Sequence, residues 1–325
     1  MDLKALFEDF NQKNVLIVGD AMIDAYMWGE VNRESPEAPV PVVEVKKHEN
    51  RLGGAANVAL NLKALGATPI LCSIVGIGNK GRLFLNLMQE AKLSTRGIIS
   101  NKERKTTVKT RVIADNKHQL RIDEEKTSPI INSNEFLQLI ESLMNNIDVI
   151  VLQDYNKGVL NSEVIEEIIA TANQNRIPTI VDPKEQNFYS YRNCTIFKPN
   201  LAEIKVGMNI EFDANNVSEI EKASTELRTQ LAAKGVLLTL SEKGVFINSE
   251  KESKHTPAFK RNIIDISGAG DTVLAVASLC LASAVKYNDL SVLSTLAGGI
   301  VCEEVGVVPI NKEKLLVEAL EHISK

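Results

Sequence analysis

The sequence predicts an α/β fold built around a wound, mostly parallel sheet. Short, continuously apolar runs, which are typical of buried strands, alternate with helical stretches through most of the 325 residues. No repeat period, low-complexity tract or flexible linker interrupts this alternation. Two other segments alternate apolar and polar residues instead, which indicates half-exposed strands. We therefore expect one compact unit with a small accessory sheet.

The wound sheet is expected from apolar runs that are too short for helices. Helices are expected over 1–10, 55–65 and 81–91, and a fully apolar helix over 272–279. A short strand is expected just before that last helix, over 262–266. The other expected strands are 14–18, 68–75, 148–152, 179–181, 195–197 and 235–240.

The accessory sheet is expected from strict alternation. Residues 39–46 alternate, and so do 106–123 on both sides of a plausible turn at 115–117. Such alternation indicates antiparallel strands with one exposed face. We expect strands from about 26–48 and 104–124 to form a lid over the active site, with an apolar face that pairs two subunits. An ordinary extension of the sheet edge would give the same pattern.

The composition is that of an ordinary globular protein and excludes several classes. A formal net charge of −5 argues against a nucleic-acid partner. No apolar run is long enough to span a membrane, and the acidic N-terminus lacks the features of a signal peptide, so a cytoplasmic location is expected. The histidines are isolated and the cysteines are scattered, which predicts reduced core thiols rather than a metal site; the cysteines are Cys72, Cys194, Cys280 and Cys302.

The most informative motif is Asp-Ile-Ser-Gly-Ala-Gly-Asp at 265–271. Its Gly-Ala-Gly turn opens the apolar helix, where unpaired N–H groups and the helix dipole favour an anion. Asp271 places a carboxylate at the mouth of this turn. That combination suits a base that accepts a hydroxyl proton while a phosphoryl group is transferred. The alternative is a structural turn in which Ser267 or Asp271 caps the helix.

A second glycine site opens the helix expected over 55–65. Gly53 and Gly54 would let a ligand approach the backbone, and Asn57 can donate and accept hydrogen bonds, which suits a polyol. Asp24 follows the first strand, and ligands of wound sheets gather at the carboxyl ends of strands. A tight turn capped by Asn57 and a loop or cap carboxylate at Asp24 are the structural alternatives.

A third glycine motif, Gly-x-Gly-x-x-Gly at 76–81, matches a dinucleotide-binding pattern. It lies in the third apparent strand unit, and no acidic residue ends a second strand at the expected distance. We therefore set the dinucleotide interpretation aside. The P-loop sequence Gly-x-x-x-x-Gly-Lys-Ser/Thr does not occur, which argues against a P-loop phosphotransferase.

Together the motifs resemble the ribokinase-like (PfkB) carbohydrate kinases over roughly residues 10–310. The stretch 53–66 is similar to the first signature of that family, and 265–271 to the second. Further stretches occur in the order of one branch, the D-glycero-β-D-manno-heptose-7-phosphate kinases, which form the kinase half of a bifunctional ADP-heptose synthesis protein; they are 34–43, 153–158, 181–184 and 198–203. The resemblance implies a ribokinase-like three-layer fold with a small antiparallel lid sheet, in a single kinase domain over 1–325.

The sequence departs from the family pattern in two places. Bifunctional members continue into a nucleotidyltransferase domain, whereas this sequence ends at Lys325, so we expect a monofunctional kinase or a piece of a longer protein. Many members have Thr where this chain has Ile266, which removes a hydroxyl but leaves the backbone turn. Whether a monovalent cation such as K⁺ activates the enzyme stays open.

The resemblance implies transfer of the ATP γ-phosphoryl group to O1 of heptose 7-phosphate, on the route to ADP-heptose for lipopolysaccharide core. It implies that Asp271 is the base and that the N–H groups of Gly268, Ala269 and Gly270 hold the transferring group. Exact sugar specificity depends on the pocket, so another PfkB sugar, sugar-phosphate or nucleoside kinase is the rival enzyme. A catalytically silent sugar-phosphate sensor is the rival from another class.

The remaining candidate residues fall into two groups by the same resemblance. For the nucleotide, Asn200 and Glu203 would organise Mg²⁺ through water, although their spacing also fits a helix capping box. The stretch 239–244 would contact the phosphates and ribose through Thr239, Ser241 and Gly244, and 297–301 would wall the adenine. For the sugar, we expect hydroxyl contacts from Asp24, Gly53, Gly54 and Asn57, and 7-phosphate contacts from Lys109, Arg111, Arg121 or Lys157, each of which could instead be merely solvated.

Overall fold

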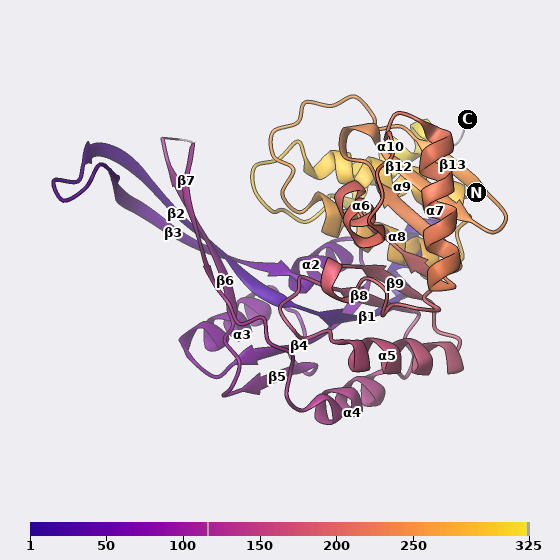
Figure 1. Ribbon diagram of the computed structural model, residues 1–325, viewed down its shortest axis with the longest axis horizontal. Coiled ribbons are helices and arrows are strands. Elements are labelled where there is room, and N and C mark those ends of the chain that lie inside the picture. The colour runs from indigo at the N-terminus through magenta and orange to yellow at the C-terminus, as the bar shows by residue number, and fades with distance from the viewer. Residues whose placement is uncertain (116, 324–325) are drawn as a thin grey trace.

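The computed structural model of the protein describes residues 1–115 and 117–323. A nine-stranded sheet forms the centre of these residues. Its strand order is β13-β12-β11-β10-β9-β8-β1-β4-β5 (Figure 1). The pairs β11–β12 and β12–β13 are antiparallel, and the other described pairs of this sheet are parallel. The expected wound, mostly parallel sheet is confirmed. The strands are β1 (Asn14–Gly19), β4 (Thr68–Gly76), β5 (Ile98–Asn101), β8 (Val149–Gln153), β9 (Thr179–Asp182), β10 (Ile196–Phe197), β11 (Gly235–Thr239), β12 (Val245–Ser249) and β13 (Ser253–Thr256).

Helices cover both faces of this sheet and create two hydrophobic cores (Figure 1). Strand β1 shows the division, because Val15 and Ile17 face one core while Leu16 and Val18 face the other. One core is packed by α1 (Leu3–Asp9), α2 (Ala55–Ala64), α3 (Asn79–Glu90), α8 (Ala269–Ala282), α9 (Tyr287–Val301) and α10 (Lys312–His322). The other is packed by α4 (Ser133–Leu143), α5 (Ser162–Gln174), α6 (Leu201–Met208) and α7 (Val217–Leu231).

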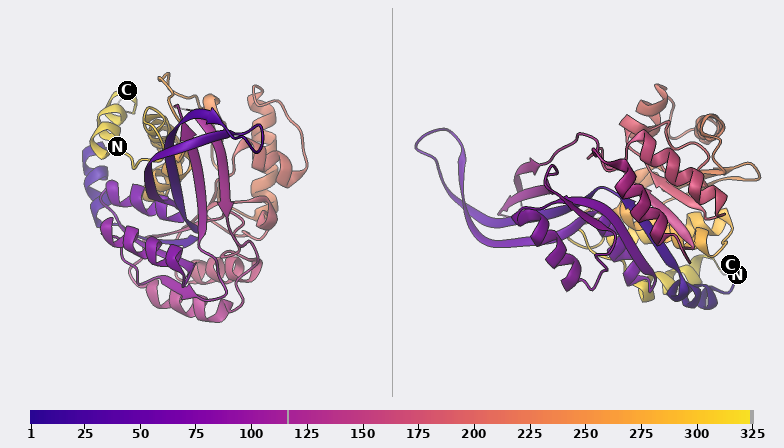
Figure 2. Two further views of the ribbon diagram at one scale, coloured as in Figure 1. Left: turned by 90° about the vertical axis from the view of Figure 1, so that its left-hand side faces the viewer. Right: turned by 90° about the horizontal axis from the view of Figure 1, so that it is seen from below.

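A second sheet of four described strands has the order β3-β2-β6-β7. It is formed by β2 (Ala21–Glu34), β3 (Pro41–Gly54), β6 (Thr107–Ala114) and β7 (Lys117–Glu124). The β2–β3 ribbon projects far from the body (Figures 1 and 2). The expected small sheet is confirmed, but the expectation of purely antiparallel pairing is wrong for β2 and β6, which pair in parallel. Both strands leave the main body in the same direction, and each is followed by a strand that returns.

The segment 262–266 is not a strand, contrary to the sequence prediction. Its backbone is held instead by the carbonyl of Cys302, which accepts hydrogen bonds from the N–H groups of Ile264 and Asp265 at 2.8 and 3.2 Å. Ile264 and Ile266 are 54% and 75% exposed, so the apolar pattern here does not mark a buried strand. The turn expected at 115–117 includes Asn116, which lies outside the described residues.

Two further sequence expectations concern glycines and cysteines. Gly81 packs so close to the end of β4 that a Cβ would lie 1.6 Å from the Gly76 oxygen, so this glycine has a packing reason. The four cysteines are buried and free, as expected. Over residues 1–115 and 117–323, no helix combines the length and the apolar character needed to cross a membrane.

Candidate active site

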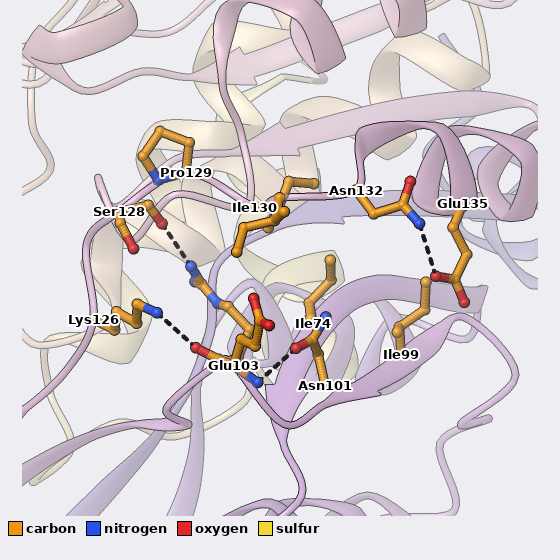
Figure 3. Close-up of a pocket in the computed structure, with 12 residues that line it drawn as sticks. Ile74, Ile99, Asn101, Glu103, Lys126, Ser128, Pro129, Ile130, Asn132 and Glu135 are labelled. Carbon is orange, nitrogen blue, oxygen red and sulfur yellow. Dashed lines mark hydrogen bonds between the residues drawn. The ribbon is translucent and has the colours of Figure 1, made fainter.

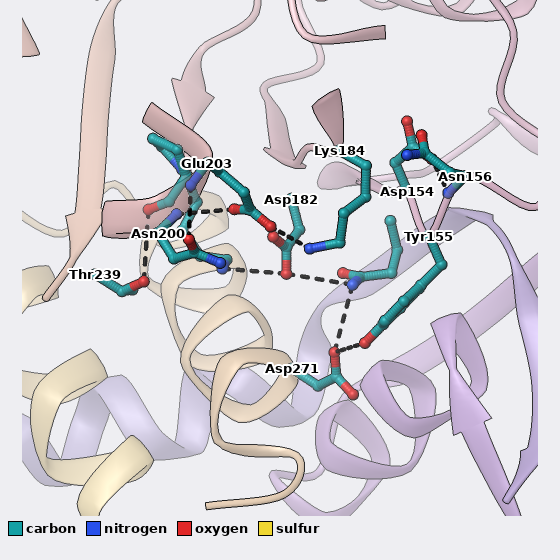
Figure 4. A network of polar contacts seen from close by, with 12 residues as sticks. Asp154, Tyr155, Asn156, Asp182, Lys184, Asn200, Glu203, Thr239 and Asp271 are labelled. Carbon is teal, nitrogen blue, oxygen red and sulfur yellow. Dashed lines mark hydrogen bonds and ion pairs between the residues drawn. The ribbon is translucent and has the colours of Figure 1, made fainter. Parts of the chain in front are cut away.

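A cleft of about 520 Å³ lies at the carboxyl ends of the central strands, beside the start of α8 (Figure 4). Tyr155 follows β8, Asp182 ends β9, and Lys198 follows β10. The carboxyl ends of parallel strands share one sheet edge, which is where ligands of wound folds bind. The cleft is lined by Tyr155, Asp182, Lys184, Lys198, Asn200, Glu203, Thr239, Gly268, Gly270 and Asp271.

The Gly-Ala-Gly turn forms the N-terminus of α8. Gly268 precedes the helix with φ of +81°, a left-handed conformation that favours glycine. No atom lies within 4 Å of where a Cβ on Gly270 would stand, so the backbone here is open to a ligand. The Ala269 N–H donates to the Ile266 oxygen at 3.3 Å, whereas the N–H groups of Gly268 and Gly270 find no acceptor among the described residues. Such open donors at a helix start suit an anion.

Asp271 occupies the third position of α8 and is buried. Asn57 Nδ2 donates to its Oδ2 at 2.8 Å, and the Tyr155 hydroxyl donates to its Oδ1 at 2.8 Å. The pKa of Asp271 is raised to about 6, mainly because the carboxyl group is buried. The two hydrogen bonds lower this pKa. The charge of Asp182 raises the pKa and the charge of Lys198 lowers it. The carboxylate is therefore held in place and poised near neutral pH, as a general base requires.

The residues expected to bind sugar hydroxyls come together, although Asp24 lies within β2 rather than in a loop. Gly53 is its diagonal neighbour on β3, and a Cβ on Gly53 would lie 2.1 Å from Asp24 Oδ2, so only glycine leaves room for this carboxylate. Gly54 ends β3 and precedes α2 with φ of +58°. Asn57 then projects from α2 to Asp271. Of the four, Asn57 contacts Asp271, and none lines the cleft itself.

The four candidate cations are placed differently. Lys109 Nζ lies 5.1 Å from the centroid of the Tyr155 ring, and burial lowers the pKa of Lys109. Arg111 pairs with Asp24, and Lys157 with Glu125 at 2.8 Å. Among the described residues no carboxylate lies within 4.0 Å of the Lys109 ammonium group. Lys109 is thus a half-buried cation available to an anionic ligand.

Arg121 is different from the other three. Its side chain is 60% exposed on β7, and its guanidinium pairs with Asp123 at 3.0 Å on the same strand. Nothing places it in the cleft.

Asn200 and Glu203 form the capping box of α6. Asn200 Oδ1 accepts from the Glu203 N–H at 2.9 Å, and Glu203 Oε2 accepts from the Asn200 N–H at 2.8 Å. The other Glu203 oxygen pairs with Lys184 (Figure 4). Within the described ranges, no group of three or more His, Cys, Asp or Glu side chains is arranged to hold a metal ion. The capping alternative is therefore realised, and both residues still face the cleft.

The segment 239–244 enters the cleft only at its start. Thr239 lines the cleft beside Asn200. Ser241 is exposed, and Gly244 has φ of +93° in the turn before β12, where a Cβ would lie 2.1 Å from the Thr256 oxygen. Neither lines the cleft. The stretch 297–301 lies in α9 and is mostly buried in a hydrophobic core.

Sequence reasoning assigned no role to several residues that the cleft contains. Tyr155 and Lys184 are two of them, and the ring of Tyr155 also lies 5.8 Å from Lys184 Nζ. Gln153 donates to Asp182 and Asp271, while Lys198 pairs with Asp182 at 3.1 Å. Each stands at or just after the end of a strand, and that position was the available signal.

A separate pocket lies beside β4, lined by residues such as Ile74, Glu103 and Ile130 (Figure 3). It is largely closed by its own hydrogen bonds. Arg104 donates to the Ser128 oxygen at 2.8 Å, and Lys126 donates to the Glu103 oxygen at 2.7 Å. This pocket shares no lining residue with the cleft at α8.

Comparison with known proteins agrees with this geometry. The model of the family described as "pfkB family carbohydrate kinase" matches residues 12–314. "Bifunctional protein HldE" of Helicobacter pylori (strain P12) is 37% identical over 297 residues, covering 90% of this chain and 64% of that protein. HldE of Citrifermentans bemidjiense is 34% identical over 320 residues, covering 98% of this chain and 65% of that protein. The chain thus spans slightly less than two thirds of these relatives.

Solved structures show the same fold at low identity. Phosphofructokinase-2 from Escherichia coli, in complex with substrates and products, has a TM-score of 0.80 at 16% identity, with 96% of this chain and 100% of that chain covered. Arabidopsis thaliana ribokinase, complexed with ribose and ATP, has a TM-score of 0.75 at 17% identity, with 95% and 99% covered. These likenesses establish a ribokinase-like fold.

Proposed function

The chain belongs to the pfkB family of carbohydrate kinases, and we propose that it transfers the γ-phosphoryl group of ATP to O1 of D-glycero-β-D-manno-heptose 7-phosphate. The observation that carries the proposal is the buried Asp271 carboxylate beside the open N-terminal turn of α8. The product would be heptose 1,7-bisphosphate, for ADP-heptose and lipopolysaccharide core. The HldE relatives and the branch-specific motifs support heptose 7-phosphate as the acceptor.

In this mechanism the sugar O1 bonds to the γ-phosphorus while the bond from that phosphorus to the β–γ bridging oxygen breaks, and ADP leaves. Asp271 accepts the O1 proton. The N–H groups of the 268–270 turn face the charge on the transferring group. Because the transition state of phosphoryl transfer is loose, positioning and charge stabilisation account for most of the rate. Lys184 and Lys198, both lining the cleft, add positive charge for the phosphates of ATP.

The family implies Mg²⁺, and the residues present fit an ion held through water. Both Glu203 oxygens and the Asn200 oxygen already accept a protein hydrogen bond, and each keeps a free lone pair for a water. Mg²⁺ usually keeps several waters and takes few protein ligands. When bound, it neutralises phosphate charge. Activation by K⁺ is a separate proposal that these residues do not address.

We expect Lys109→Met to raise the KM for the sugar phosphate roughly 10–100-fold while kcat changes much less, since a charge-assisted hydrogen bond contributes about 1.5–3 kcal/mol. Lys109 is the half-buried cation near Tyr155, and the 7-phosphate needs such a partner. Steady-state kinetics with varied sugar phosphate measure this effect.

Arg121→Met is the matched control, because Arg121 lies on the adjacent strand but is exposed and paired with Asp123. It should leave the KM within about twofold, as expected of an exposed pair. If Arg121→Met raises the KM and Lys109→Met does not, the phosphate subsite is misassigned.

The acceptor is tested by ATP-dependent turnover on a panel of sugars, sugar phosphates and nucleosides. Heptose 7-phosphate should give the highest kcat/KM. Faster turnover of another compound would make the chain a kinase of that compound, and binding without turnover would favour a sensor. The motif at 34–43 cannot decide the question directly, because it lies at the far end of the β2–β3 ribbon (Figure 1).

We also propose that residues 1–325 act as one kinase domain that forms a homodimer through the lid sheet. The projecting ribbon and β7 expose apolar side chains that a second copy would cover. These are Val40, Val45, Leu120 and Ile122, between 39% and 58% exposed.

A further inference from the structure

Tyr155 contacts Asp271 and two lysines in the cleft. Its hydroxyl donates to Asp271 Oδ1, on the oxygen opposite the one that accepts from Asn57. Its ring lies 5.1 Å from Lys109 Nζ, on lid strand β6, and 5.8 Å from Lys184 Nζ, on the segment after β9. One side chain therefore connects the proposed base, the proposed sugar-phosphate cation and a cation of the proposed ATP site; Figure 4 shows Tyr155 with Asp271 and Lys184.

The backbone that carries Tyr155 is anchored by Asp20, a carboxylate that is only 1% exposed. Asp20 accepts hydrogen bonds from the N–H groups of Tyr155 and Lys157 at 2.9 Å each, and of Val159 at 3.1 Å. Three backbone donors on one buried carboxylate fix the loop far more tightly than a surface loop is usually held. The position of the Tyr155 hydroxyl is therefore determined by the fold.

We propose that Tyr155 is a positioning residue for the phosphoryl transfer, which orients Asp271 toward the acceptor hydroxyl and holds Lys109 and Lys184 beside it. The inference rests on the proposed function, because it takes Asp271 as the base. Oδ1 accepts from Tyr155 and, at 3.4 Å, from Gln153, while Oδ2 accepts from Asn57, so the carboxylate cannot rotate freely. The second lone pair of Oδ2 then faces a fixed direction.

The hydroxyl acts as a donor throughout. Burial, and then the charge of Asp271, hold the pKa of Tyr155 well above its ordinary value, so the phenol stays protonated. A donor to the charged form of a carboxyl favours that form. The other charged groups facing Asp271 are Asp182 from β9 and Lys198 after β10, and they are unchanged by a substitution at Tyr155.

Tyr155→Phe tests the proposal because it removes the hydroxyl and keeps the ring. We expect kcat to fall roughly tenfold, with the KM for sugar phosphate and ATP changed by less than about twofold. The pKa of about 6 for Asp271 predicts an acid limb of the kcat–pH profile near pH 6 in the unmodified protein. In Tyr155→Phe this limb should move up by about one pH unit, because loss of the hydrogen bond raises the pKa of Asp271.

Tyr191→Phe is the matched control. It removes a buried hydroxyl that donates to Asp154 at 2.7 Å. Asp154 is next to Tyr155 in the chain, but this hydroxyl has no hydrogen bond to Asp271. A merely structural role for Tyr155 would make the two variants behave alike. An acid limb that moves equally in both variants, or in neither, overturns the proposal.

A titration that needs no turnover separates this inference from the proposed function. The carboxyl ¹³C resonance of Asp271, assigned by its loss in Asp271→Asn, is followed against pH in the unmodified protein and in Tyr155→Phe. A higher midpoint in Tyr155→Phe supports the contact even if no sugar phosphate is turned over, in which case the proposed function alone fails. An unmoved midpoint overturns the positioning role even in an active kinase.

Discussion

Asp271→Asn is expected to lower kcat at least ~100-fold, with little change in the KM for the sugar, because an amide cannot accept the proton of the acceptor hydroxyl and loss of a general base typically costs ~10²–10⁴-fold. The side chain keeps its size. Asn57 can still donate to the amide oxygen at the Oδ2 position, and the amide NH₂ group at the Oδ1 position can donate to the hydroxyl oxygen of Tyr155. The variant should therefore fold and bind substrate. Steady-state kinetics, with circular dichroism to confirm the fold, measure the effect.

Asp289→Asn is the control that separates catalysis from helix capping. Asp271 is the third residue of α8, and Asp289 is the third residue of α9, so both carboxylates lie in a first helical turn. Removing either charge should cost the helix a similar ~0.3–1 kcal/mol. Only Asp271→Asn should lose turnover. An Asp271→Asn enzyme with nearly unmodified kcat would show that this carboxylate is a cap and that the base lies elsewhere.

The sequence predicted the architecture well because burial is periodic. The short apolar runs mark β1, β4 and β8, which are buried on both faces of the sheet. An apolar run does not indicate a buried strand where its residues are exposed, as at 262–266. The sequence also placed the start of the lid at about residue 26, whereas β2 begins at Ala21, since the inner half of that strand is buried and the outer half is exposed and no single pattern covers it.

The candidate site was predictable where a motif is local and not where side chains converge from distant segments. The 268–270 turn and Asp271 share one motif, and the structure places them as expected. The contact between Asp271 and Tyr155 joins residues 116 positions apart, and no spacing rule announces it. Arg121 shows the opposite error, because the alternation of a strand indicates its face but not whether an ion pair will hold its side chain in solvent.

Gly270→Ala is expected to reduce kcat between about tenfold and 10³-fold while leaving the protein as stable as before or more so. A methyl group at this position meets no protein atom within 4 Å, so it enters the space above the turn where the transferring phosphoryl group is proposed to lie. Blocking a preorganised donor of this kind costs up to ~10³-fold in kcat. Alanine is also the better helix former, by about 0.5–1 kcal/mol within a helix.

Gly78→Ala is the matched control for this opposition of activity and stability. Gly78 precedes α3, and a Cβ there also meets no atom within 4 Å, but Gly78 does not line the cleft. Kinetics and thermal melting should therefore separate the two variants. Gly270→Ala should show the reduced kcat with an equal or higher Tm, and Gly78→Ala should be fully active. Full activity of Gly270→Ala would mean that the transferring group does not approach the backbone of this turn. Loss of both activity and stability would mean instead that Gly270 is needed for the fold of α8 rather than for the reaction.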